Sequence, residues 1–448
     1  MNKIIMMLMT FLCLFLSIQA STLQAPSNDP FYTPPAKFEN KKPGTILKFR
    51  ILPTSSLPSI SNENLKAIYQ FLYRTNDGLG KPTASVTTLL VPTNADPTKL
   101  ISYQASEDSA SKDCAPSYIY QQELNPGPIP IPSPEPFLLD DLLSRGYYLN
   151  MADYEGLQAM FAVGLMAGHA VLDSIRAVLN SGNLTQLHPD ATVQMLGYSA
   201  GAHATGWAAQ LQSSYASELK IIGAAMGGTP VDVNATINAV NGGPFASLIP
   251  SGILGMMHQY DDLADYVDQI ILPDKKQEFL EAQSMCSQDI LDKYAFQDIF
   301  SYFSRPDFLA DPVAIKAISN NIMGKMGAPR FPLFMFHAIH DEIVPIAPAM
   351  DLYNSWCADT STSIQFVADE LSEHFILTVT GTANAINFLV DQFNNKTAPP
   401  GCTYRTTVTS ALDDDALPFT VRLILYELET LLGYLPVSNN TFLNNRKR

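Results

Sequence analysis

The stretch Thr192-Val-Gln-Met-Leu-Gly-Tyr-Ser199-Ala-Gly-Ala-His-Ala-Thr-Gly-Trp207 decides the fold of this 448-residue chain. Residues 192–196 form a short apolar run typical of a buried strand, and residues 200–215 have the small-residue pattern of a helix. Between them, Gly-Tyr-Ser199-Ala-Gly matches G-x-S-x-G, the sharp strand-to-helix turn that raises a serine above a parallel sheet. The sequence contains no second match. We therefore expect a strand, a tight turn and a helix here.

Ser199 is the candidate nucleophile at this turn. Such a turn strains the serine backbone, and Gly197 and Gly201 avoid clashes where the strand and the helix converge. The N-terminus of the helix offers unpaired N–H groups and a positive dipole end to a developing oxyanion. The alternative is a glycine-rich turn with an inert serine, and the strand–turn–helix context favours the nucleophile.

The order of predicted elements indicates an α/β fold. Runs at 45–52, 65–73 and 85–91 suit an antiparallel start, and short apolar strands follow at 100–103, 147–152, 192–196, 219–226, 331–337 and 364–367. Helical patterns at 157–179, 200–215 and 375–393 lie between or after them, and an apolar helix at 419–435 closes the chain. This order predicts a mostly parallel central sheet with helices on both faces, and together with the serine turn it predicts the α/β-hydrolase fold.

One segment interrupts the alternation of strands and helices. The roughly 100 residues from Met226 to Phe331 contain helical runs and no clear strand, which is too long for an ordinary connection. We expect a helical lid or cap insertion at 232–328, between a first core part at 21–231 and a second at 329–448.

A nucleophilic serine needs a base, and in this fold the chain order is serine, acid, histidine. Of the seven histidines, only His374 follows every predicted strand, in a polar loop before a long helix. Asp341, in the loop after the strand at 331–337, is the preferred acid, with Glu342 as its near rival. A surface histidine and a solvated loop carboxylate are the alternatives. Placement favours His374 as the base and Asp341 as the residue that orients it.

The N-terminus has the pattern of a secretory signal peptide, 1–20. Lys3 precedes an apolar run at 4–16, and Ala20 offers a small residue at the cleavage point. A membrane anchor is the alternative, but the run is well short of the roughly 20 residues needed to span a bilayer. We expect a secreted, extracellular protein without a stable membrane anchor. The formal net charge of −16 disfavours nucleic acid as a partner.

The cysteines fit an oxidising compartment. Cys13 lies in the signal peptide, which leaves an even number in the mature chain. They are Cys114, Cys286, Cys357 and Cys402. Two disulfides are expected, and sequence alone leaves three pairings open. Free buried thiols are the alternative, and a zinc site is disfavoured because no Cys-x-x-Cys pair occurs.

Four sequons suggest surface glycosylation of a secreted chain. Their asparagines are Asn183, Asn234, Asn395 and Asn439.

The chain resembles the fungal secretory lipase family, the type that includes lipase A, over nearly its whole mature length. Its ordered motifs carry the resemblance: Ile101-Ser-Tyr-Gln104, Glu107-Asp-Ser109, Asp113-Cys-Ala-Pro-Ser-Tyr118, Gly146-Tyr-Tyr148, Asp153-Tyr-Glu-Gly156, the serine turn, His340-Asp-Glu342 and Glu373-His374. The resemblance implies a helical lid domain and lipase activity on triacylglycerols. It also implies that Ser199, Asp341 and His374 form a catalytic triad.

Further site residues follow only from this resemblance. It implies that Asp108 is the oxyanion-loop aspartate, acting with the backbone N–H of Ala200. It also implies disulfides between Cys114 and Cys286 and between Cys357 and Cys402.

The leading hypothesis is a secreted lipase that hydrolyses acylglycerol esters through an acyl-enzyme, at a water–lipid interface. This chemistry requires no cofactor and no metal. The apolar runs at 245–249 and 253–257 are interpreted as an acyl-chain tunnel and a mobile lid, or more simply as a helical layer packed on the sheet. An esterase on soluble or unusual esters and a non-catalytic binding protein on a hydrolase scaffold are the alternatives. The sequence leaves acyl-chain length and oligomeric state open.

Overall fold

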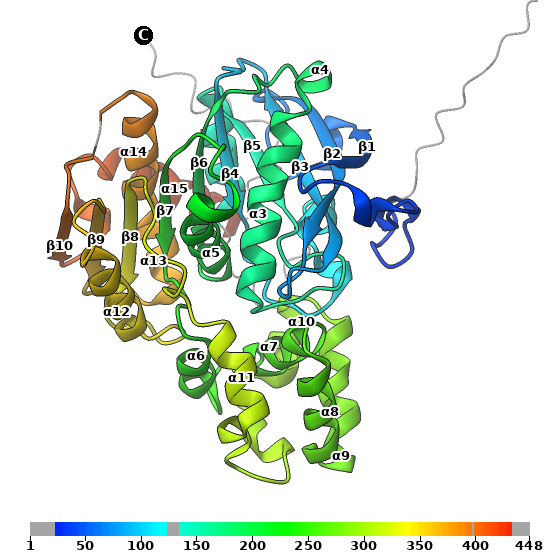
Figure 1. The fold of residues 1–448 in the computed structure, drawn as a ribbon. Coiled ribbons are helices and arrows are strands. Elements are labelled where there is room, and N and C mark those ends of the chain that lie inside the picture. The colour runs from blue at the N-terminus through cyan, green and yellow to red at the C-terminus, as the bar shows by residue number, and fades with distance from the viewer. Residues whose placement is uncertain (1–22, 123–133, 397, 432–448) are drawn as a thin grey trace, which may run out of the picture.

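The structure, a computed structural model, describes residues 23–122, 134–396 and 398–431, and is built around a ten-stranded sheet (Figure 1). The strand order is β1-β2-β3-β5-β4-β6-β7-β8-β9-β10. The strands are β1 (Ile46–Leu52), β2 (Leu65–Asn76), β3 (Pro82–Pro92), β4 (Lys99–Gln104), β5 (Tyr148–Ala152), β6 (Thr192–Tyr198), β7 (Ile221–Gly227), β8 (Leu333–Ala338), β9 (Ile364–Asp369) and β10 (Cys402–Thr407).

The type of strand pairing changes once across the sheet, from antiparallel to parallel. The pairs β1–β2, β2–β3 and β3–β5 are antiparallel, whereas every pair from β5 through β4 and β6 to β10 is parallel. An antiparallel start followed by a parallel sheet confirms the predicted fold class.

Helices cover both faces of this sheet. Against one face pack α3 (Gly164–Leu179), α5 (Ala200–Tyr215) and α12 (Ile346–Cys357). Against the other pack α2 (Glu135–Ser144), α14 (Thr382–Phe393) and α15 (Leu417–Leu431), together with the short α13 (His374–Thr380). Two further short helices are α1 (Pro116–Ile119) and α4 (Gly182–Thr185). Since successive strand residues point to opposite faces, burial on both sides explains why the parallel strands read as continuous apolar runs.

Six α-helices between β7 and β8, with the loops and short 3₁₀ helices that join them, form a separate group at the bottom of Figure 1, which we call the cap. They are α6 (Val233–Val240), α7 (Leu248–Met257), α8 (Asp261–Ile270), α9 (Pro273–Glu281), α10 (Ser287–Tyr294) and α11 (Pro312–Asn320). All lie within 232–328, the segment predicted to be an insertion. Leu254 and Met256 of α7 are buried, so this apolar run packs against protein.

Two predicted helices have different bounds in the structure. The helix expected at 157–179 begins only at Gly164, because Ala159 and Ala162 have positive φ angles of 51° and 64° and cannot belong to a right-handed helix. The helix expected at 375–393 is two helices, α13 and α14, that meet at Gly381. A Cβ atom on Gly381 would lie 2.5 Å from the Phe336 ring, so only glycine fits there.

The sequence suggested that the strand at 364–367 is the last one, but the structure has one more strand after it. β10 follows it and pairs with it in parallel at the sheet edge. Most side chains of β10 are exposed or half-exposed, which explains why its sequence, Cys-Thr-Tyr-Arg-Thr-Thr, lacks the apolar signal of a buried strand.

Several sequence predictions lie outside the described residues: the signal peptide with Cys13, the sequon at Asn439, and the end of the last predicted helix at 432–435. Among the helices of the described ranges, none has the length and apolar character required to cross a bilayer.

Candidate active site

Ser199 sits in a strained turn between β6 and α5. Its φ and ψ angles of 53° and −123° are rare for a residue with a side chain. A Cβ on Gly201 would lie 2.0 Å from the carbonyl oxygen of Gln104, and a Cβ on Gly197 would lie 2.2 Å from that of Gly201. Both flanking positions therefore exclude any larger residue, and the turn keeps the serine hydroxyl at the carboxyl end of the sheet.

The three residues predicted as a triad lie in one hydrogen-bonded chain. His374 Nε2 is 2.9 Å from Ser199 Oγ, and His374 Nδ1 is 2.7 Å from Asp341 Oδ2. Ser199 follows β6, Asp341 follows β8, and His374 starts α13 after β9. The carboxyl ends of neighbouring parallel strands thus bring together residues far apart in sequence.

Asp341 is held as a carboxylate. Its Oδ1 accepts the backbone N–H groups of Ile343 and Val344, at 3.0 and 2.7 Å. Burial pushes the pKa of Asp341 upward, but the hydrogen bond and charge of His374 and the nearby His337 outweigh it and hold that pKa below its usual range. An ionised Asp341 can orient the His374 ring and stabilise it when it takes a proton.

Two further residues position His374: Glu342, which the sequence offered as a rival acid, and Tyr198, which it did not single out. Glu342 Oε2 accepts the backbone N–H of His374 at 2.8 Å, at the start of α13. The hydroxyl of Tyr198, inside the serine turn, donates to the His374 carbonyl oxygen. The histidine backbone is therefore fixed at both its N–H and its carbonyl group. Glu342 binds backbone, not the ring, so its geometry differs from that of Asp341.

The loop after β4 carries Asp108 to the nucleophile. Asp108 has a positive φ of 50° and lines the same cavity as Ser199 and Ala200, the first residue of α5. The loop is anchored by the Tyr154 hydroxyl, which donates to the Ala105 carbonyl at 2.7 Å. The site thus brings together the two residues implied for the oxyanion hole, and the Ala200 N–H lies at a helix N-terminus, where such groups lack an intrahelical acceptor.

Four carboxyl groups cluster beside this loop, a feature that the sequence reasoning did not interpret. Burial raises the pKa of Glu107 and Glu155 well above the usual range, and repulsion from neighbouring carboxyl groups adds to each rise. Burial also raises the pKa of Asp108 to about 6, against the opposing charge of His374. It raises that of Asp153 to about 7, although Ser117 donates two hydrogen bonds to this carboxyl. Several of these groups therefore hold protons in mildly acidic solution.

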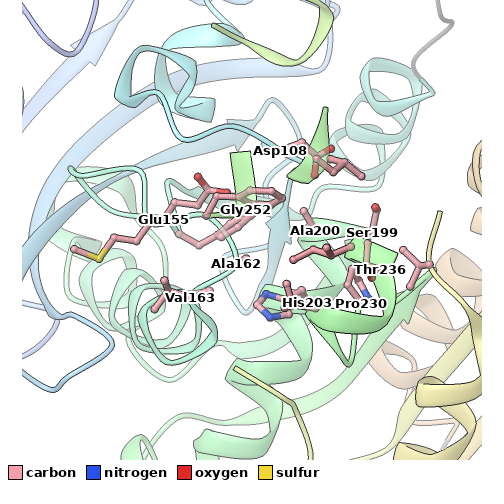
Figure 2. A pocket seen from close by; sticks show the side chains of 18 of the residues that line it. Asp108, Glu155, Ala162, Val163, Ser199, Ala200, His203, Pro230, Thr236 and Gly252 are labelled. Atoms are coloured by element: carbon pink, nitrogen blue, oxygen red, sulfur yellow. The ribbon is translucent and has the colours of Figure 1, made fainter. Parts of the chain in front are cut away.

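A cavity of about 700 Å³ opens beside Ser199, between the core and the cap. Its walls include Val163 at the start of α3, Ile237 of α6, and Leu248 and Gly252 of α7. Figure 2 shows Asp108 and Glu155 around the same space as Ser199 and Ala200. Its largely apolar lining suits a hydrocarbon chain.

A second cavity of about 800 Å³ meets the first at Ser199. It is lined by His374 and Phe375 of α13, and by Phe245 and Leu291 of the cap. The two parts of an ester whose carbonyl lies at Ser199 can therefore extend into two adjoining cavities.

His203 also borders the first cavity but does not resemble a base. Burial lowers its pKa to about 4, and the Trp207 indole N–H donates to its Nε2 at 3.0 Å. His203 is therefore a packed helix residue.

Both implied disulfides are present. Cys114 bonds to Cys286, which joins the segment after the Asp108 loop to the start of α10 in the cap. Cys357 bonds to Cys402, which joins α12 to β10.

The sequons differ in exposure. Asn183 and Asn395 are exposed, whereas Asn234 is half-buried in α6 and its sequon residue Thr236 lines the first cavity. Glycosylation stays a prediction.

Known proteins resemble the chain closely. The sequence profile described as secretory lipase matches residues 133–401. Lipase A of Arthroderma benhamiae is 37% identical over 91% of this chain and 88% of its own length. Lipase 5 of Candida albicans is 36% identical over 84% of this chain and 83% of its own. The closed-state structure of Candida antarctica lipase A, 31% identical, superposes with a TM-score of 0.82 over 91% of this chain and 96% of that one. The chain therefore belongs to the secretory lipase family and is a carboxylic ester hydrolase.

Proposed function

We propose that this protein is a secreted triacylglycerol lipase that acts through an acyl-enzyme on Ser199. One observation carries the proposal: the hydrogen-bonded chain Ser199–His374–Asp341 lies where two largely apolar cavities meet. The relatives named lipases, at 36–37% identity over most of the chain, support the substrate class.

In the first step, Ser199 Oγ attacks the ester carbonyl carbon while His374 Nε2 takes its proton. Asp341 keeps the Nδ1 proton of the ring directed toward itself and stabilises the imidazolium. The tetrahedral oxyanion is bound by two hydrogen-bond donors, the backbone N–H of Ala200 and a donor group of Asp108 in the facing loop. His374 then protonates the departing glycerol oxygen, and the acyl group stays on Ser199.

In the second step, a water molecule takes the place of the alcohol. His374 removes a proton from the water, which attacks the acyl carbon, and the same imidazolium returns that proton to Ser199 Oγ. The fatty acid is released and the serine is restored. We assign the acyl chain to the first cavity, whose walls are mostly hydrocarbon, and the glycerol part to the second, which also holds His374.

We propose secretion on three grounds. The chain begins with a signal-peptide pattern, two disulfides link segments far apart in sequence, and the matching family is described as secretory. We further propose that the insertion at 232–328 acts as a lid, because cap residues form one wall of each cavity.

The test is the hydrolysis of emulsified triolein and of p-nitrophenyl esters from acetate to palmitate by wild type and by Ser199→Ala. Wild type should hydrolyse triolein and prefer medium or long esters. The variant should retain the wild-type melting temperature and lose activity by a factor on the order of 10⁴ or more. A fluorophosphonate should label wild type only. A wild type that prefers acetate and ignores triolein is an esterase on soluble esters, and an active, folded Ser199→Ala protein excludes the mechanism.

A further inference from the structure

Exposed apolar side chains gather in one part of the molecule. More than half of the large apolar residues that are exposed, within the ranges the structure describes, lie between 371 and 428. They are Leu371, Phe375, Ile376, Tyr404, Val408, Leu412, Leu417, Val421, Ile424, Leu425 and Leu428. Scattered exposed leucines are ordinary, but a concentration of this size marks an interaction surface.

The helix α15 is apolar on two opposite sides. Phe419 and Leu423 are buried against the sheet side of the molecule, among the residues of α2 and α14. The opposite side carries a stripe of five exposed residues at helical spacing: Leu417, Val421, Ile424, Leu425 and Leu428. A surface helix ordinarily turns a polar side to water, so an apolar outer side indicates a second apolar partner.

This stripe lies on elements that adjoin other exposed apolar residues. The helices α13 and α15 and the short 3₁₀ helix η8 (Ser410–Leu412) contact one another. The backbone N–H of Leu371, just before α13, donates to the carbonyl of Val408 at 3.1 Å, which places two exposed apolar residues side by side. We call the surface formed by the exposed apolar residues of 371–376, 408–412 and α15 the docking face.

The docking face reaches the catalytic site at Phe375. Phe375 is 41% exposed and also lines the second cavity, next to His374 and Ser199. Its ring lies 5.3 Å from that of Phe245 in the cap. The docking face therefore borders the second cavity at Phe375.

The charges near this face select the kind of lipid. Four exposed acidic residues border it, on the loops beside α13 and before α15: Glu370, Glu373, Asp414 and Asp415. The whole chain carries a formal charge of −16. Anionic phospholipid headgroups would be repelled, whereas an uncharged surface imposes no such penalty.

We propose that the docking face binds the surface of an uncharged lipid, such as an acylglycerol droplet, and holds the Phe375 side of the second cavity against it. This inference rests on the proposed lipase function and assigns the contact to α13, η8 and α15. Leu254 and Met256 of the cap, in contrast, are buried and available only if the cap opens. Burial of the apolar stripe in the lipid would replace its contact with water.

The test measures binding separately from catalysis. Binding is followed by flotation with triolein droplets, in the Ser199→Ala background so that the lipid stays intact. Leu425→Gln/Leu428→Gln removes two exposed apolar residues and keeps good helix formers. Phe49→Thr/Ile51→Thr is the matched control, since both side chains are at least half exposed and lie on β1, the edge strand farthest from β10 in the sheet.

The α15 variant should bind droplets about tenfold more weakly, whereas the β1 control should bind as wild type. Vesicles rich in phosphatidylserine should bind wild type more weakly than droplets do. With Ser199 present, both variants should hydrolyse p-nitrophenyl butyrate within about twofold of wild type, which verifies folding. Equal droplet binding by all three proteins would overturn the proposal.

Two other outcomes are distinguishable. If wild type sediments as a dimer without lipid and the α15 variant as a monomer, the face binds a second copy and the proposal fails. If wild type hydrolyses the butyrate ester but not triolein, the proposed lipase function fails, and the flotation result still decides whether the docking face binds lipid.

Discussion

Asp341 and Glu342 are adjacent in the chain, and both bind His374, but at different points. Asp341 Oδ2 lies 2.7 Å from the ring nitrogen Nδ1, whereas Glu342 Oε2 accepts the backbone N–H at 2.8 Å. One carboxylate therefore acts on the proton chemistry of the ring and the other on the position of the residue. Two side chains of the same chemical class have separable roles at one histidine.

This geometry predicts unequal effects of two amide substitutions. Asp341→Asn should lower kcat on p-nitrophenyl butyrate by a factor on the order of 10⁴, because the amide cannot stabilise the imidazolium and favours the wrong ring tautomer. Glu342→Gln should lower it by less than about tenfold, since an amide oxygen still accepts the His374 N–H. Steady-state kinetics at matched folded concentration decides. The reverse order of effects would make Glu342 the acid.

The disulfide between Cys114 and Cys286 should stabilise the fold more than the one between Cys357 and Cys402. The sequence separations are 172 and 45 residues, so the first restricts a longer loop of the unfolded chain. Replacing each cysteine pair by serine should lower the free energy of unfolding by about 2–5 kcal/mol. The loss should be about 1 kcal/mol larger for the first pair than for the second. Urea unfolding of both variants measures this, and a larger loss for the second pair would refute the loop argument.

The sequence predicted well what is local or strongly ordered along the chain. The serine turn requires residues within five positions of one another, and the steric demands at Gly197 and Gly201 leave a clear signature. The rule of chain order then left His374 as the candidate base. Order and placement also favoured Asp341 over its rival Glu342, but the separate role of Glu342 could not be predicted, since which oxygen reaches the ring and which reaches the backbone depends on the loop conformation.

The carboxyl cluster shows what the sequence left out. Glu107 follows β4, and Asp153 and Glu155 follow β5. These strands are parallel neighbours, so their carboxyl ends meet. The acidic residues after both strands are visible in the sequence. Predicting that they meet requires knowing that the two strands are neighbours in the sheet, which tertiary packing decides. The edge strand β10 was missed for the opposite reason, because an exposed edge needs no apolar run.

Protons on this cluster predict a stability that falls as pH rises. Burial moves the pKa of Asp153 from 3.8 to about 7, so between these values the folded chain binds more protons than the unfolded chain. The free energy of unfolding therefore decreases with pH across that window, and the contribution is lost above about pH 7. Asp153→Asn removes this titration and should reduce the fall in melting temperature from pH 4 to pH 8 by on the order of 2–5 °C.

The control for this pH effect is Asp359→Asn, since Asp359 pairs with Arg330 in an exposed salt bridge and its pKa is lowered, not raised. Calorimetric scans of the three proteins across the range provide the comparison. The Asp359 variant should keep the wild-type slope. A slope unchanged in the Asp153 variant would mean that this carboxyl is ionised in the folded protein throughout.

The acyl cavity offers a position where chain-length preference can be changed. Gly252 of α7 lines the cavity beside Ser199, and a Cβ added there would meet no atom within 4 Å. Gly252→Leu therefore places a side chain in the space assigned to the acyl chain without a backbone clash, and a residue other than glycine also favours the helix. We expect kcat/KM for p-nitrophenyl palmitate to fall at least about tenfold, which corresponds to about 1.4 kcal/mol, with butyrate changed by less than about threefold. Gly252→Ala, which adds only a methyl group, is the matched control and should keep the wild-type profile. An equal loss on both esters would place the acyl chain elsewhere, the second cavity being the next candidate.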